Sequence, residues 1–347
     1  MSQSETVVTL APWLQEQWAK WSQLSDRLGH AYLLAGPQGI GIESFVDQAV
    51  QKVLCLQPIN DAACQQCQGC HLYQGKQHPD YYHLKRLEDK KDISVDQVRT
   101  LINKLNETSH QGGYKVIWVE GVEFLNQSAF NALLKTLEEP AAKTLFLLTT
   151  HEIGRLPATI KSRCQLLSFT PPALADAVTW LHQALPQVDL ALVKRALRLN
   201  WGAPFDALEW IEEGKFEEDN QWKEGLKQLQ SGRKTVSQVV AEWLKWSTPI
   251  SVFDYFYQWS VSAVRSVSYK VDETQTWAEA TTTEQQLQLQ NWLRFQQAIL
   301  QAKENWLGNA NKELLLETLC LEWLEVQQVA EPFQSVFQSK LQKGTLS

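Results

Sequence analysis

A short apolar run leads directly into a glycine-rich loop at residues 31–44, AYLLAGPQGIGIES. The run Ala31–Ala35 has the length and composition of a buried strand, and a helical pattern follows from Ser44 to Leu54. A strand, a glycine loop and a helix in this order form the setting in which backbone N–H groups and a helix N-terminus hold phosphate groups. The stretch therefore predicts an α/β domain of the phosphate-loop type.

Four further strand-like runs follow, with helical patterns such as Ser94–Asn106 and Ser128–Glu138 between them. The runs are Tyr81–Leu84, Lys115–Val119, Thr144–Thr149 and Gln165–Phe169. This alternation predicts a parallel sheet that is covered by helices on both faces. No convincing strand follows Ala173, and long amphipathic patterns there predict an all-α remainder.

Breaks in the pattern divide the chain into three expected domains. Pro171-Pro172 follows the last strand, and an acidic stretch at 209–220 precedes the long amphipathic patterns. A polar loop is expected at 270–283. The expected domains are an α/β domain at 1–169 that includes the cysteine-rich segment 55–70, a small helical domain at 170–212 and a helical C-terminal domain at 213–347.

The composition excludes several classes of protein. Of the 347 residues, 44% are hydrophobic and 20% are charged, which is typical of neither a membrane protein nor a disordered chain. No apolar run approaches the ~18 residues of a membrane helix. Residues 1–11 lack a basic start followed by an apolar run, so no signal peptide and a cytoplasmic location are expected. The net charge of −7 argues against a protein that grips nucleic acid over most of its surface.

Four of the six cysteines lie close together in the sequence, at Cys55, Cys64, Cys67 and Cys70. Four thiolates are the number that tetrahedral Zn²⁺ takes in a closed structural site. Free buried thiols, two disulfides or an iron–sulfur cluster are the alternatives. Clustering in a chain without a secretory signal favours metal over disulfides, so the spacing predicts four ligands to structural zinc.

The glycine loop lacks the residues that a working phosphate loop needs at its end. Gly36, Gly39 and Gly41 are present, but Ile42 and Glu43 stand where a lysine and a Ser or Thr would contact the phosphates and Mg²⁺. After the third strand, Glu120 is followed by Gly121, which cannot take a proton from water. We therefore expect that this chain has lost productive ATP binding at its own site.

Four short motifs carry a family resemblance. They are HAYLL at 30–34, SVDQVR at 94–99, NALLKTLEEP at 131–140 and SRC at 162–164. Together they resemble the AAA+ subunits of bacterial clamp loaders, the γ/τ and δ′ subunits of DNA polymerase III. The resemblance covers about residues 10–210, and it implies an AAA+ domain, a helical lid domain and a C-terminal helical collar domain that mediates oligomerisation. The family also carries a similar four-cysteine zinc module.

Within that family, the sequence is similar to the inactive kind of subunit rather than to the ATPase. The segment GAPFDAL at 202–208 resembles the family's sensor segment, but Phe205 stands where the family has an arginine on the γ-phosphate. Arg163, in the SRC motif, is kept. The resemblance implies that this arginine acts in trans, as an arginine finger for the ATP of an adjacent subunit.

The resemblance implies a catalytically inactive component of the DNA polymerase III holoenzyme, a nucleotidyltransferase complex. The expected partners are γ/τ and δ subunits in a hetero-pentameric ring. Through that ring the chain would help to place the sliding clamp on primer–template DNA, with no membrane involved. Two alternatives remain open: an active ATPase of the γ/τ type, and a zinc-dependent DNA-binding protein.

Overall fold

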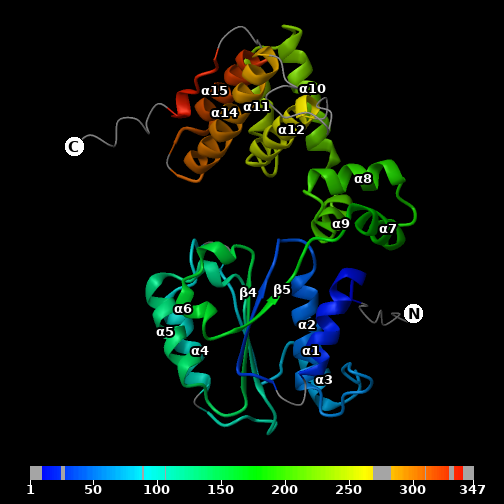
Figure 1. The fold of residues 1–347 in the computed structure, drawn as a ribbon, viewed down its shortest axis with the longest axis vertical. Helices are drawn as coiled ribbons and strands as arrows, with labels where there is room; N and C mark the ends of the chain where they lie inside the picture. Colours follow the sequence, from blue (N-terminus) through cyan, green and yellow to red (C-terminus); the bar gives the residue numbers. More distant parts are fainter. Residues whose placement is uncertain are drawn as a thin grey trace, which may run out of the picture. The chain divides into compact units, whose positions relative to one another are not determined.

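The computed structural model of the chain describes residues 10–24, 28–87, 90–105, 107–268, 283–308, 310–327 and 332–338. The polar loop expected at 270–283 lies almost entirely outside the described residues. The chain forms two compact units, Met1–Glu212 and Glu213–Ser347 (Figure 1).

The first unit is built on a sheet of five parallel strands in the order β2-β3-β4-β1-β5. These strands are β1 (Ala31–Ala35), β2 (Tyr81–Leu84), β3 (Lys115–Val119), β4 (Thr144–Thr150) and β5 (Gln165–Ser168). Each strand expected from the sequence is present, and its bounds agree to within one residue. Every residue of β1, β3 and β4 is buried, as expected for central strands of a parallel sheet that is covered on both faces.

Helices cover the sheet on both faces (Figure 1). One face carries α1 (Gln15–Gln23), α2 (Ile42–Leu54) and α3 (Gln68–Gln74), and the other carries α4 (Val95–Leu105), α5 (Gln127–Glu138) and α6 (Ala158–Lys161). Successive strand residues face opposite sides, so Leu33 belongs to the buried cluster that includes Leu133 of α5, whereas Leu34 belongs to the cluster that includes Phe45 of α2. Short 3₁₀ turns lie at η1 (Pro12–Leu14), η3 (Val122–Phe124) and η4 (Ile153–Arg155).

Three further helices complete the first unit: α7 (Leu174–Ala184), α8 (Leu190–Leu199) and α9 (Pro204–Glu212). They pack on one another through buried residues such as Leu181 and Leu197. Pro204 is the first residue of α9. Proline lacks a backbone N–H, and this costs nothing here because an N–H at the first helical position has no acceptor within the helix. The next N–H, of Phe205, donates to the carbonyl of Gly39 (2.9 Å), so α9 begins directly on the glycine loop.

The described residues of the second unit form helices joined by turns and loops, and none of them forms a strand. Its elements are α10 (Phe216–Gln230), α11 (Val236–Trp243), α12 (Ser251–Ser268), α14 (Thr283–Trp306), α15 (Lys312–Val326) and η5 (Val336–Gln338). Its buried core is strongly aromatic, with Trp222, Trp243, Phe256 and Trp323 in edge-on or tilted ring contacts. The expectation of an α/β fold followed by an all-α part is therefore confirmed.

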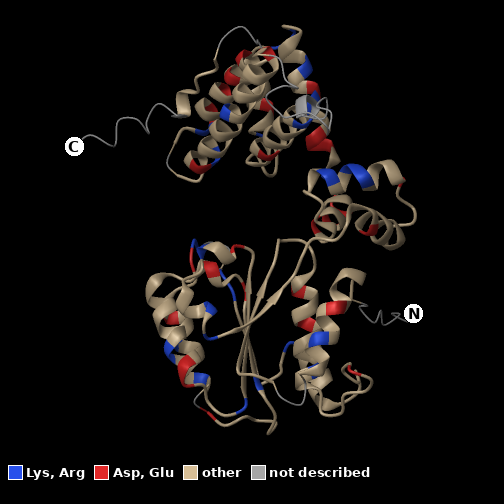
Figure 2. Cartoon of the chain, in the orientation of Figure 1, with Lys and Arg blue, Asp and Glu red and all other residues tan. Residues whose placement is uncertain are grey.

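The ribbon colours of Figure 2 show acidic and basic residues interspersed along the helices of both units. Within the described ranges, none of the helices combines the length and the apolar character that crossing a membrane requires.

Candidate functional site

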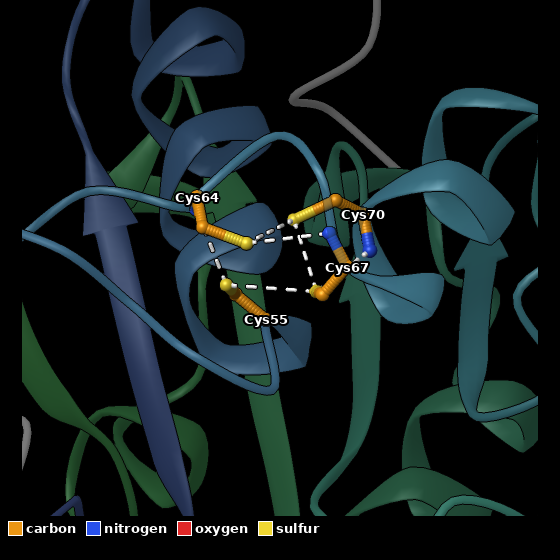
Figure 3. A group of neighbouring side chains, drawn as sticks. All are labelled: Cys55, Cys64, Cys67 and Cys70. Carbon is orange, nitrogen blue, oxygen red and sulfur yellow. Dashed lines mark hydrogen bonds between the residues drawn. The ribbon is translucent and has the colours of Figure 1, made fainter.

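The four clustered cysteines come together at the C-terminal end of α2. Cys55 follows the last turn of α2, Cys64 lies in the loop after it, and Cys67 and Cys70 belong to the start of α3. The Cys67 sulfur caps α3 by accepting from the N–H of Cys70. The four sulfur atoms point toward one another and all lie within 4.8 Å (Figure 3).

The spacing of these sulfur atoms fits a tetrahedral metal ion. Cys55 and Cys67 Sγ are 3.8 Å apart, Cys64 and Cys70 Sγ 3.9 Å, and Cys67 and Cys70 Sγ 3.5 Å. A zinc ion at ~2.3 Å from each of four thiolates needs sulfurs about 3.8 Å apart. None of the four is in a disulfide. The cluster can therefore hold a metal ion.

Backbone N–H groups also favour the thiolate form at part of the cluster. Burial opposes ionisation of Cys67, but the N–H groups of Cys70 and Leu56 donate to its sulfur and lower its pKa to about 6. At Cys55 and Cys70 burial prevails and raises the pKa. Since metals bind the thiolate, a cation would have to stabilise the charge at these two positions.

The glycine loop lies at the other end of α2. Gly41 caps the helix with a φ of 95°, a conformation that favours glycine. Ile42 is fully buried, so it offers no polar group to a ligand. Glu43 stands in the first turn of α2, where a carboxylate is stabilised by the helix dipole but would repel a phosphate.

His151, which follows β4, bridges this loop and α2. Its Nδ1 is 3.0 Å from the carbonyl oxygen of Gly36, and its Nε2 is 3.3 Å from a carboxylate oxygen of Glu43. Both partners are acceptors, so both ring nitrogens carry protons and the ring is cationic. The bond to Glu43 is the main cause that raises the pKa of His151 to about 9, against the opposing effect of burial. The positive charge of His151 is therefore already paired with the carbonyl oxygen of Gly36 and the carboxylate of Glu43.

Two side chains from the start of α9 cover the glycine loop. A Cβ atom added to Gly39 would lie 2.3 Å from the Asp206 carboxylate, and one added to Gly41 would lie 2.4 Å from the Phe205 ring. Such distances mean that both side chains rest directly against the glycine backbone. The space above the loop is therefore filled by this chain.

Two tryptophans extend that cover. The Trp180 ring of α7 lies 4.8 Å from the Phe205 ring and 5.4 Å from the Trp13 ring, measured between centroids. The Trp13 indole N–H donates to the carbonyl of Ile40 (2.8 Å). Residues of the N-terminal turn and of the α7–α9 group therefore both contact the glycine loop.

The acidic residues after β3 are also engaged within the chain. Glu120 accepts from His83 at 2.8 Å, and this bond is the main reason that its pKa is lowered. Glu123 accepts from the N–H of His151 (3.0 Å). Gly121 has a φ of 70° and offers no side chain at the position next to Glu120.

Arg163 lies in the turn between α6 and β5, apart from the cysteine cluster and the glycine loop. Its guanidinium donates to the carbonyl of Thr159 (2.8 Å) and forms an ion pair with Glu138, at the C-terminal end of α5. About a third of the side chain (32%) is exposed, so the arginine is held at the surface with part of its guanidinium accessible.

The structure brings the four predicted cysteines together and keeps Arg163 separate from them. Sequence reasoning named Phe205 only as a missing arginine, and it did not find Asp206, His151, Trp13 or Trp180 around the loop. These residues are far from the loop in the sequence: Trp13 lies 27 positions from its partner Ile40, and His151 lies 115 positions from its partner Gly36. Neither spacing nor residue type signals such contacts in one sequence.

Known proteins resemble this chain along most of its length. The family described as "DNA polymerase III, delta subunit" matches residues 14–173. The DNA polymerase III subunit delta' of Pseudomonas aeruginosa is 36% identical over 326 residues, which cover 90% of this chain and 96% of that protein.

Two other relatives match this chain over shorter stretches. The DNA polymerase III subunit delta' of Escherichia coli is 43% identical over 199 residues, or 57% of this chain and 59% of that protein. The DNA polymerase III subunit tau/gamma of Haemophilus influenzae is 34% identical over 179 residues, or 49% of this chain and 25% of that protein.

Proposed function

Because the chain belongs to the family of DNA polymerase III delta' subunits, we propose that it is a catalytically inactive subunit of a bacterial clamp loader. In this role it hydrolyses no ATP itself and completes the ATP site of a neighbouring subunit. The observation that carries the proposal is the glycine loop, which lacks its lysine and is covered by Phe205 and Asp206.

The charges around the loop support the loss of ATP binding. A triphosphate would meet the carboxylates of Asp206 and Glu43, and the nearby cation, His151, is already paired with Glu43. Each missing charge-assisted contact costs about 1.5–3 kcal/mol of binding free energy. To enter, the nucleotide would also have to displace the Phe205 and Trp180 rings, which are in contact.

Arg163 is the residue that we propose to act on a neighbour. A guanidinium that reaches the γ-phosphate of an adjacent site stabilises the charge that develops during phosphoryl transfer. Its partial exposure is compatible with such a contact, and its ion pair with Glu138 is of the exposed kind that contributes little, about 0–1 kcal/mol. The guanidinium can therefore exchange Glu138 for a phosphate.

We propose Zn²⁺ as the ion of the four-cysteine cluster, with Cys55, Cys64, Cys67 and Cys70 as its ligands. The closed set of four thiols leaves no position for a substrate, so the role of the metal is structural. It would tie the end of α2 to the start of α3.

The proposed partners are γ/τ-type ATPases and the δ subunit in a five-membered ring, with the sliding clamp and primer–template DNA engaged through that ring. In this scheme residues 1–169, 170–212 and 213–347 are the AAA+ domain, the lid domain and the collar domain. The proposed location is the cytoplasm. A role as an active ATPase of the γ/τ type is the alternative.

Nucleotide titration of the purified chain distinguishes the inactive subunit from the active ATPase. A fluorescent ATP analogue should show no saturable binding up to millimolar concentrations, and no phosphate should be released. A γ/τ-type subunit measured in parallel serves as the positive control. Micromolar affinity together with turnover by this chain would favour the ATPase alternative and refute our proposal.

A further inference from the structure

The segment 332–338 (PFQSVFQ), named here the strap, packs on the helices of the second unit. Only its end, η5 (Val336–Gln338), has regular secondary structure. Side chains of α14 and α15 form hydrogen bonds with it. The helices therefore hold the strap as a binding site holds a short peptide, through side chains that contact individual residues.

Phe333 is the anchor of the strap. It is 3% exposed, and its ring lies 6.2 Å from the Phe295 ring of α14, measured between centroids. Asn291 of α14 is itself buried, and its side-chain oxygen accepts from the backbone N–H of Phe333 (2.9 Å). The Arg294 guanidinium donates to the carbonyl of the same residue (3.1 Å). Helix α14 thus pairs both backbone groups of one strap residue and buries its aromatic side chain.

Glu322 of α15 contacts the next part of the strap. The Ser335 hydroxyl lies 2.9 Å from both carboxylate oxygens, and the N–H of Val336 donates to one of them (2.7 Å). Glu322 is buried, and among the described residues no cation forms an ion pair with it. Burial is the main cause that raises its pKa, and the charge of Glu325 adds to this effect. Two neutral donors therefore hold a buried acidic group.

The burial of Glu322 makes docking of the strap costly. A carboxylate that is buried without a cation loses hydration, and two hydrogen bonds to neutral groups offset this loss only in part. When the strap leaves, water can solvate Glu322 and Asn291 again. We therefore expect the strap to open at a lower free energy than that of global unfolding.

We propose that the strap is a detachable ligand held in cis, and that its release opens its site to an extended segment of a partner protein with the same chemistry. The site consists of Asn291, Arg294, Phe295 and Glu322, named here the strap site. Its ligand is an aromatic residue followed two positions later by a serine. The apolar contact with Phe295 selects the ring, and Glu322 selects a hydroxyl donor and repels an acidic side chain.

The strap site goes beyond the function proposed above, because it uses neither Arg163, nor the glycine loop, nor the cysteine cluster. Residues 328–331 connect the strap to Gln327, which follows α15. So short a tether gives the strap an effective concentration of about a millimolar or more at its site, so a free peptide binds well only when the strap is weakened.

Fluorescence anisotropy of the full chain with a labelled peptide of residues 331–338 tests the proposal. Phe333→Asp in the chain weakens the strap, so the peptide should bind this variant about tenfold or more tightly than it binds the wild-type chain. Gln334→Asp is the matched control, because it adds the same charge at an exposed position of the strap. The control should bind the peptide with the affinity of the wild-type chain.

Changes in the peptide test the recognition without altering the chain. With the Phe333→Asp chain, a peptide that carries Phe333→Ala should bind about tenfold or more weakly, because it lacks the anchor. A peptide that carries Ser335→Ala should bind about fivefold more weakly, because it lacks the hydroxyl that donates to Glu322.

Circular dichroism should show that the Phe333→Asp chain keeps its helices. Loss of the helices would overturn the proposal, because the strap would then be part of the fold rather than detachable. No saturable binding by the folded variant would also overturn it, as would equal affinity for the wild-type and Phe333→Asp chains or for the altered peptides. Because the assay uses no ATP and no partner subunit, its failure leaves the proposed function untouched.

Discussion

The two ends of helix α2 hold structures of opposite kinds. At the C-terminal end, four cysteines from a 16-residue segment (55–70) form a cluster that is open to a metal ion. At the N-terminal end, the glycine loop is covered by side chains from remote parts of the chain, among them Phe205 and Asp206. The sulfur atoms at one end could hold a metal ion, whereas at the other end side chains of the chain itself rest against the glycine loop.

From this difference we infer that the cysteine end, unlike the glycine end, gains stability from a bound ion. At the cysteine end, burial raises the pKa of Cys55 and Cys70, so the proposed cation would have to stabilise their thiolates. At the glycine end, the cationic ring of His151 contacts the carbonyl oxygen of Gly36 and the carboxylate of Glu43. Variants at each end therefore test whether the two ends of α2 differ in this way.

The largest effect is expected at the cysteine end. Cys67→Ser removes the sulfur that also caps α3, so we expect loss of the bound metal and destabilisation of about 3–5 kcal/mol. Metal analysis and thermal unfolding measure both effects. Cys164→Ala, a cysteine outside the cluster, should retain about one metal per chain. Full metal content and an unchanged Tm in the Cys67 variant would contradict the assignment.

A smaller effect is expected at the glycine end. Gly41→Ala places a methyl group 2.4 Å from the Phe205 ring at a φ of 95°, so overpacking adds to backbone strain and costs about 2–4 kcal/mol. Gly112→Ala is the matched control, because it shares a positive φ (70°) but has no atom within 4 Å. Denaturant unfolding should give a clearly lower free energy of unfolding for Gly41→Ala than for Gly112→Ala. Equal losses would mean that Phe205 does not press on the loop.

The smallest effect is a dependence of stability on pH. The pKa of His151 is raised to about 9 in the folded chain from about 6.5 when unfolded, so its contribution is complete below pH 6.5 and is lost as the pH rises through 9. After allowance for the partial exposure of Glu43, we expect about 1–2 kcal/mol. The stability difference between the wild-type chain and His151→Gln should shrink from pH 6.5 to pH 10. A difference that stays constant would rule out the charged bridge.

The same contrast explains how much could be predicted from the sequence. The strands were predictable because they are short, mostly apolar runs such as Ala31–Ala35, and the cysteine cluster was predictable because its members are close in sequence. The loss of the phosphate-binding lysine at Ile42 was also visible. The cover over the loop was not, because the contact of Asp206 with Gly39 depends on how the α7–α9 group packs. The proposed role of Arg163 came from resemblance, since its local contacts are those of an ordinary surface arginine.

The ATPase rate of a reconstituted clamp loader tests whether Arg163 acts on the ATP site of a neighbouring subunit. The complex would contain γ/τ-type and δ subunits together with this chain, either as wild type or as Arg163→Ala. Lys161→Ala, an exposed neighbouring cation, serves as the control. The account predicts that Arg163→Ala assembles normally and loses the turnover of the one site that it completes, while Lys161→Ala keeps the full rate. An unchanged rate in a complete Arg163→Ala complex would contradict it.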